Sequence, residues 1–140
     1  MPRALPILLL LFSALSFSCN DEENNNIPLT EVNIIIQIND PDYIRLQTVG
    51  GWEYISGGSR GIILFRLSQD QFRAFDRHCT FQPSNTCALV SVDPNNITAS
   101  DDCCGSAFLL NDGSVSRPPA NTALKQYRTS FDGTTLRISN

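Results

Sequence analysis

Short apolar and β-branched runs alternate with turn-forming residues along the chain from residue 28 onward. Runs of roughly four to eight such residues, bounded by Gly, Pro, Asn and Asp, are typical of β-strands. This region shows no sustained helical periodicity, so we expect no long amphipathic helix in it. The expected strands cover residues 32–38, 43–47, 52–55, 61–67, 71–77, 88–92, 107–110, 123–128 and 136–138.

Turn signals separate these runs at regular intervals. Gly50 and Gly51 mark a turn or bulge, and residues 111–114 (Asn-Asp-Gly-Ser) are a strong hairpin signal between two apolar segments. We find no internal repeat and no change in composition that would divide this region. The pattern therefore predicts one all-β domain over residues 28–140, built as a small β-sandwich or barrel.

The first residues have the organisation of an export signal. Arg3 supplies a positive charge, an apolar segment covers residues 7–15, and a small residue, Ser18, directly precedes Cys19. The apolar segment is too short to span a bilayer comfortably. We predict a signal peptide over residues 1–18 of the lipoprotein type, with Cys19 as the lipidated residue; an ordinary secretory signal is the alternative.

Residues 20–26 are polar and acidic and cannot contribute to a hydrophobic core. Together with Cys19 they predict a lipidated, flexible tether over residues 19–27. The acidic start of this tether resembles the surface-export signals of Bacteroidetes-type lipoproteins. We therefore expect an outer-membrane lipoprotein of the cell envelope, held to the membrane by its lipid, with exposure at the cell surface as one option.

Charge and composition exclude several classes of function. The net charge is −4, and no basic cluster occurs anywhere in the chain, which argues against nucleic acid as a partner. The chain has a single histidine, His78, so mechanisms that need several histidines are excluded. No serine has the histidine partner that triad chemistry needs, and we expect no enzymatic activity. A protein partner, if one exists, is not indicated by the sequence.

The chain contains five cysteines, an odd number. Lipidation of Cys19 leaves an even set in an exported protein, and such a set indicates disulfides rather than free thiols. Sequence spacing alone leaves all three pairings of four cysteines open. The remaining cysteines are Cys79, Cys87, Cys103 and Cys104.

Much of the chain between residues 61 and 138 resembles the Rieske domain family. The order and spacing of the matching segments carry this resemblance more than any one of them does. It implies an all-β Rieske-like fold with two cysteine-bearing loops. The matching segments are 61–77, 79–80, 105–108, 112–115, 118–120, Leu124, Tyr127 and 133–138.

The ligand positions of that family are largely changed here. The family binds a [2Fe–2S] cluster through two Cys and two His. The resemblance places Cys79 at the first Cys position and Phe81, which cannot bind iron, at the first His position. It places Asp101 at the second Cys position and Cys104 at the second His position. Because His78 precedes Cys79, we interpret it as a surface or packing residue rather than a ligand.

The resemblance also implies a disulfide pairing. Some family members carry a disulfide between the two ligand loops. Cys103 matches the position of one of the two cysteines that form this disulfide. We therefore expect a Cys87–Cys103 bridge, with Cys79 and Cys104 facing each other across the vacated cluster site and forming the second bridge. Two such cross-links would hold the loops together in place of the metal.

Three functions follow from these expectations. The first is a structural or binding module of the cell envelope, lipid-anchored, disulfide-linked and without the usual cluster. The second is electron transfer through an atypical [2Fe–2S] cluster bound by Cys79, Cys104 and Asp101, with Cys87 as a fourth option. The third is thiol–disulfide redox sensing by Cys79 and Cys104.

Overall fold

The computed structural model describes residues 27–140. The predicted signal peptide over 1–18, Cys19 and all of the predicted tether except residue 27 lie outside the described residues. The described part of the chain is built from antiparallel strands and one short 3₁₀ helix. The elements are β1 (Asn33–Gln37), η1 (Pro41–Gln47), β2 (Trp52–Ile55), β3 (Ile62–Arg66), β4 (Phe72–Asp76), β5 (Val90–Val92), β6 (Thr98–Asp101), β7 (Ala107–Leu109), β8 (Val115–Arg117), β9 (Gln126–Phe131) and β10 (Thr135–Ser139).

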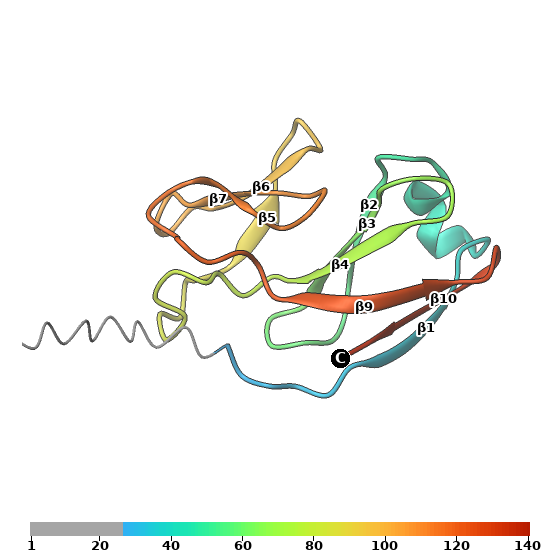
Figure 1. Ribbon diagram of the computed structural model, residues 1–140, viewed down its shortest axis with the longest axis horizontal. Helices are drawn as coiled ribbons and strands as arrows, with labels where there is room; N and C mark the ends of the chain where they lie inside the picture. The colour runs from blue at the N-terminus through green and yellow to red at the C-terminus, as the bar shows by residue number, and fades with distance from the viewer. Residues whose placement is uncertain (1–26) are drawn as a thin grey trace, which may run out of the picture.

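The strands form two sheets. The larger has the order β1-β10-β9-β4-β3-β2, and the smaller has the order β5-β6-β7-β8. The larger sheet curls, so that Ile34 of one edge strand and Ile55 of the other pack against the same hydrophobic cluster. The smaller sheet lies at the end of the molecule away from η1 (Figure 1). The all-β prediction is therefore confirmed.

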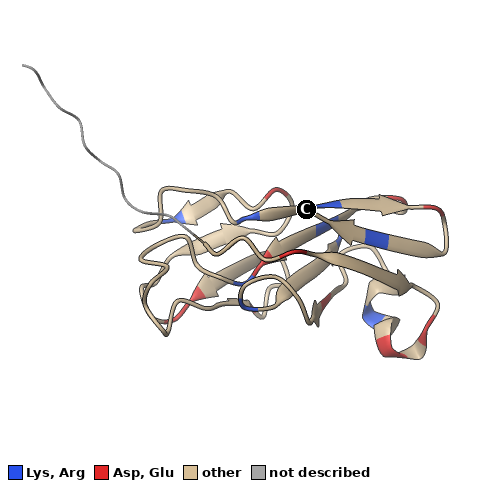
Figure 2. Ribbon diagram, turned by 90° about the horizontal axis from the view of Figure 1, so that it is seen from below, with Lys and Arg blue, Asp and Glu red and all other residues tan. Residues whose placement is uncertain are grey.

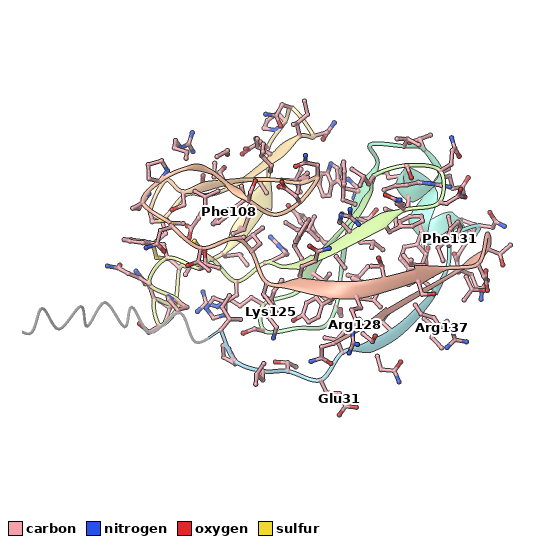
Figure 3. All side chains as sticks on the ribbon, in the orientation of Figure 1. Glu31, Phe108, Lys125, Arg128, Phe131 and Arg137 are labelled. Carbon is pink, nitrogen blue, oxygen red and sulfur yellow. A yellow bond between two sulfur atoms is a disulfide. The ribbon has the colours of Figure 1, made fainter. Side chains whose placement is uncertain are left out.

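Strand β3 lies between the two hydrophobic cores of the domain. Ile62 and Leu64 pack into the core inside the curled sheet, whereas Ile63 and Phe65 pack into the core shared with the small sheet. Successive side chains of a strand point to opposite faces, so a strand covered on both faces needs a continuous apolar run. Figure 3 shows Phe108, a member of the second core, within the small-sheet end of the molecule.

The two cysteine-bearing segments lie beside the small sheet. The first cysteine loop (residues 77–89) connects β4 to β5, and the second cysteine loop (residues 102–106) connects β6 to β7. The first loop is closed at its base by backbone hydrogen bonds, from Val90 N to Arg77 O at 2.7 Å and from Cys79 N to Ala88 O at 3.2 Å. The fold therefore holds both loops at one end of the domain.

One local expectation was wrong, and one strand had not been expected. Residues 43–47 belong to the 3₁₀ helix η1 instead of a strand. Asp40 caps this helix by accepting from the backbone N–H of Asp42, and Pro41 occupies its first turn, where a missing N–H costs nothing. Strand β6 was not expected, because its Thr-Ala-Ser-Asp sequence is polar; it forms because β5 and β7 pair with it on both sides.

Charged residues of both signs are spread along the described domain. Figure 2 shows Lys and Arg interspersed with Asp and Glu along the ribbon. Within residues 27–140, no helix has both the length and the apolar character that crossing a bilayer would require.

Candidate functional site

Three potential metal ligands meet where the two cysteine loops approach each other. Cys79 comes from the first loop, Cys104 from the second, and Asp101 from the end of β6. Their ligand atoms all lie within 4.8 Å of one another, and the two sulfurs are 3.9 Å apart. The structure thus brings together the three residues that the sequence suggested as ligands of an atypical cluster.

Asp101 is a buried carboxylate with one unused oxygen. Its side chain is 1% exposed, and its Oδ1 accepts a hydrogen bond from the backbone N–H of Cys103 at 2.7 Å. Its Oδ2 has no hydrogen-bond partner among the described residues. A buried, unpartnered polar oxygen costs about 1–3 kcal/mol, so this one calls for a partner such as a water molecule, the neighbouring Cys79 thiol or a bound ion.

Ser106 supports the Cys104 sulfur from a fully buried position. The Cys104 thiol donates to Ser106 Oγ at 3.1 Å, and the backbone N–H of Ser106 points to the sulfur at 3.4 Å. Ser106 Oγ also accepts a hydrogen bond from the backbone N–H of Ala120 at 2.9 Å. These contacts fix the Cys104 sulfur against the loop that follows β8.

Burial raises the pKa of the Cys79 thiol far above its ordinary value. The backbone amide of Phe81 acts in the opposite direction, and the neighbouring Asp101 carboxyl and Cys104 raise the pKa further. Cys79 is fully buried, and Cys104 is partly exposed. Without a bound cation, Cys79 is therefore held as a neutral thiol at physiological pH.

Cys87 and Cys103 form a disulfide in the structure, with their Cα atoms 5.8 Å apart. The bridge joins the two cysteine loops, as the family resemblance implied. The second bridge is not formed: Cys79 and Cys104 are free thiols in the structure. Their approach to 3.9 Å leaves that pairing a prediction.

His78 does not belong to the site. It is 4% exposed, its Nδ1 lies 2.8 Å from Ser59 Oγ, and its Nε2 lies 2.6 Å from the carbonyl oxygen of Pro83. Both ring nitrogens are therefore engaged in holding the first loop. This is the packing role that the sequence suggested for this histidine.

The donors present do not fit a [2Fe–2S] cluster. Such a cluster needs four protein ligands, and within residues 27–140 three candidate donors converge. Phe81 packs against the second core, and Cys87 and Cys103 are consumed by their disulfide. A cavity of about 160 Å³ lies beside the donors and is lined in part by Phe81, Asp101 and Cys104.

Sequence reasoning missed two residues that position the first loop. The Arg60 guanidinium donates to the carbonyl oxygens of Asn85 at 2.8 Å, Thr86 at 3.1 Å and Ala88 at 2.8 Å. The fully buried Asp76 accepts from the backbone N–H groups of Ser59 and Arg60, which precede β3, and of His78 in the first loop. The only sequence signal near Arg60 is the Gly57-Gly58 turn, which predicts a bend and not a binding partner.

Gly58 explains why that turn is glycine-rich. Its φ is +63°, and a Cβ at this position would lie 2.5 Å from Asp76 Oδ2 and 2.7 Å from the hydroxyl oxygen of Tyr127. Only glycine combines this backbone conformation with so close an approach. The turn therefore brings backbone donors directly onto the buried carboxylate.

Comparison with known proteins identifies the fold. The ferredoxin of carbazole 1,9a-dioxygenase from Nocardioides aromaticivorans IC177 is similar over 79% of this chain and 98% of its own, with a TM-score of 0.50 and 13% sequence identity. No protein-family model and no curated protein matches the chain. The chain is thus an all-β protein with the fold of a Rieske-type ferredoxin, and its donor set differs from the one that a [2Fe–2S] cluster needs.

Proposed function

We propose that this chain is an exported, lipid-anchored module of the cell envelope that uses the Rieske fold without a [2Fe–2S] cluster. The observation that carries the proposal is the donor set of the site. Two thiols and one carboxylate converge there, while the other two cysteines are joined to each other and His78 is engaged elsewhere. Such a module binds a ligand or a protein and carries no electrons.

The contacts that hold the two cysteine loops support this function, because they consist of protein groups alone and include no metal. The Cys87–Cys103 disulfide links the two loops, and Arg60 binds three carbonyl oxygens of the first. A loop held by hydrogen bonds and a covalent cross-link does not need a cluster to keep its shape. The domain is therefore suited to presenting a fixed surface at the envelope.

Thiol–disulfide sensing is a second candidate, favoured by the 3.9 Å separation of the Cys79 and Cys104 sulfurs. Forming that bridge would release two electrons and two protons to an external oxidant such as another protein's disulfide. A free-thiol count separates the two functions. A Cys79–Cys104 bridge that forms and is readily reduced again favours sensing, whereas a bridge that resists reduction, or two thiols that stay free in air, favours the binding module.

The first prediction concerns iron. The full chain, purified anaerobically after export, should contain no stoichiometric iron and no visible charge-transfer bands, because three donors cannot complete the four-ligand set of the cluster. Metal analysis and an absorbance spectrum check this directly. Two irons per chain, with acid-labile sulfide, would establish that the chain is an electron carrier with an atypical [2Fe–2S] cluster. That result would contradict the proposed function.

The second prediction concerns the anchor. Replacing Cys19 by Ala should move the protein from the membrane fraction to the soluble fraction and abolish incorporation of labelled fatty acid, because the acylated thiol is the proposed attachment. The matched control is Cys104→Ala, which should stay in the membrane fraction. Equal membrane association of the two variants would contradict lipid anchoring through Cys19.

A further inference from the structure

The separation of the two free thiols matches the geometry of a single metal ion. Two Zn–S bonds of about 2.3 Å at the tetrahedral angle place their sulfurs about 3.8 Å apart. The sulfurs of Cys79 and Cys104 are 3.9 Å apart, well beyond disulfide bonding distance. The two sulfur positions therefore fit the Zn–S distances of a single zinc ion, and a shift of the Asp101 side chain toward that ion completes the third bond.

Asp101 supplies the third donor of the same site. Its Oδ2 is buried and has no hydrogen-bond partner among the described residues, and a carboxylate oxygen of this residue lies within 4.8 Å of both sulfurs. Its other oxygen is fixed by the backbone N–H of Cys103 at 2.7 Å. A carboxylate held by one oxygen, with the other unused and close to two thiols, has the arrangement of a monodentate metal ligand.

We propose that Cys79, Cys104 and Asp101 bind one Zn²⁺ ion in a tetrahedral site whose fourth position is open. This inference rests on the cluster-free function proposed above and names the ligand of that module. The donor chemistry selects the ion: Mg²⁺ and Ca²⁺ require oxygen ligands, Cu⁺ favours sulfur ligands alone, and Zn²⁺ accepts thiolate and carboxylate together. Binding releases the two thiol protons to solvent.

The surroundings of the donors suit this ion. Ser106 is fully buried, and because its Oγ already accepts from Ala120 N, its hydroxyl proton is available to a Cys104 thiolate. The backbone N–H of Ser106 points at the same sulfur. These two donors would orient the Cys104 ligand and stabilise its negative charge.

The cavity of about 160 Å³ beside Asp101 and Cys104 provides the open position. Phe81, which lines it, offers no donor atom, and Cys103 is held in its disulfide. Among the described residues, no further His, Cys, Asp or Glu side chain joins the three donors. A water molecule or a small exogenous ligand therefore completes the coordination, and Cys104, one of the donors, is itself partly exposed.

The test is a Zn²⁺ titration of the full chain, purified anaerobically and stripped of metal, in competition with a chromogenic chelator. We expect one equivalent to bind. Asp101→Asn, which keeps the Oδ1 acceptor, and Cys104→Ser should each abolish tight binding, and Ser106→Ala should weaken it by about 10–100-fold. Asp102→Asn, at the exposed neighbouring position, is the matched control and should bind like the unaltered chain.

Co²⁺ provides an independent readout of the ligands. Bound in place of Zn²⁺, it should give the intense visible bands of a tetrahedral site and a thiolate charge-transfer band that is lost in Cys104→Ser. Octahedral, weakly coloured Co²⁺ would overturn the site, as would equal Zn²⁺ affinity of Asp101→Asn and Asp102→Asn. Absence of both iron and zinc binding would overturn this inference alone, whereas stoichiometric iron with sulfide would overturn the proposed function as well.

Discussion

Replacing Asp76 by Ala is expected to lower the free energy of unfolding by about 3–5 kcal/mol, because several buried donors would lose their shared acceptor. Asp76 is fully buried. Its Oδ2 accepts from Ser59 N and from the Tyr127 hydroxyl, both at 2.6 Å. Its Oδ1 accepts from His78 N at 2.8 Å and Arg60 N at 3.3 Å. Chemical denaturation followed by circular dichroism measures the loss.

The network around Asp76 offers a graded series of variants. Burial raises the pKa of Tyr127 well above its ordinary value, and Asp76 raises it further, so the phenol stays protonated and donates at physiological pH. Tyr127→Phe removes that one bond and should cost about 1 kcal/mol. Asp70→Ala, at an exposed position, should have little effect. A cost for Asp76→Ala no larger than that of Asp70→Ala would contradict this role.

The strands with strong apolar patterns could be predicted from the sequence, because burial and periodicity agree there. The run over 61–67 contains β3, and its continuous apolar character follows from burial on both faces. Strand β6 could not be predicted, since Ser100 and Asp101 are turn-formers in isolation and only pairing with β5 and β7 makes them a strand. Local propensity is a weak guide where neighbouring strands supply the hydrogen bonds.

The candidate site was partly predictable for a different reason. Cys79, Cys104 and Asp101 were suggested as a set because the resemblance to Rieske domains placed them at ligand positions, and the structure brings them within 4.8 Å of one another. The residues that support the site carry no such signal. Asp76 and Arg60 act through backbone groups of other segments, and these contacts exist only once the loops are folded.

Removal of the Cys87–Cys103 disulfide should cost about 3 kcal/mol of stability. The bridge closes a loop with a sequence separation of 16, and a cross-link of that span restricts the unfolded chain by roughly this amount. The variant that tests it is the double replacement Cys87→Ala with Cys103→Ala, compared with the unaltered chain by denaturant unfolding without reductant. Cys87 and Cys103 are exposed in the described domain, so their packing contribution is small.

A reductant added to both proteins separates this bridge from the second one that the sequence predicts. If Cys79 and Cys104 are thiols, as their 3.9 Å sulfur separation indicates, reductant should destabilise the unaltered chain by the same 3 kcal/mol or so and leave the double variant unchanged. A further loss in the double variant would mean that Cys79 and Cys104 are also bridged. That result would remove two of the three donors from the proposed zinc site, because a disulfide sulfur has no thiolate to offer a metal.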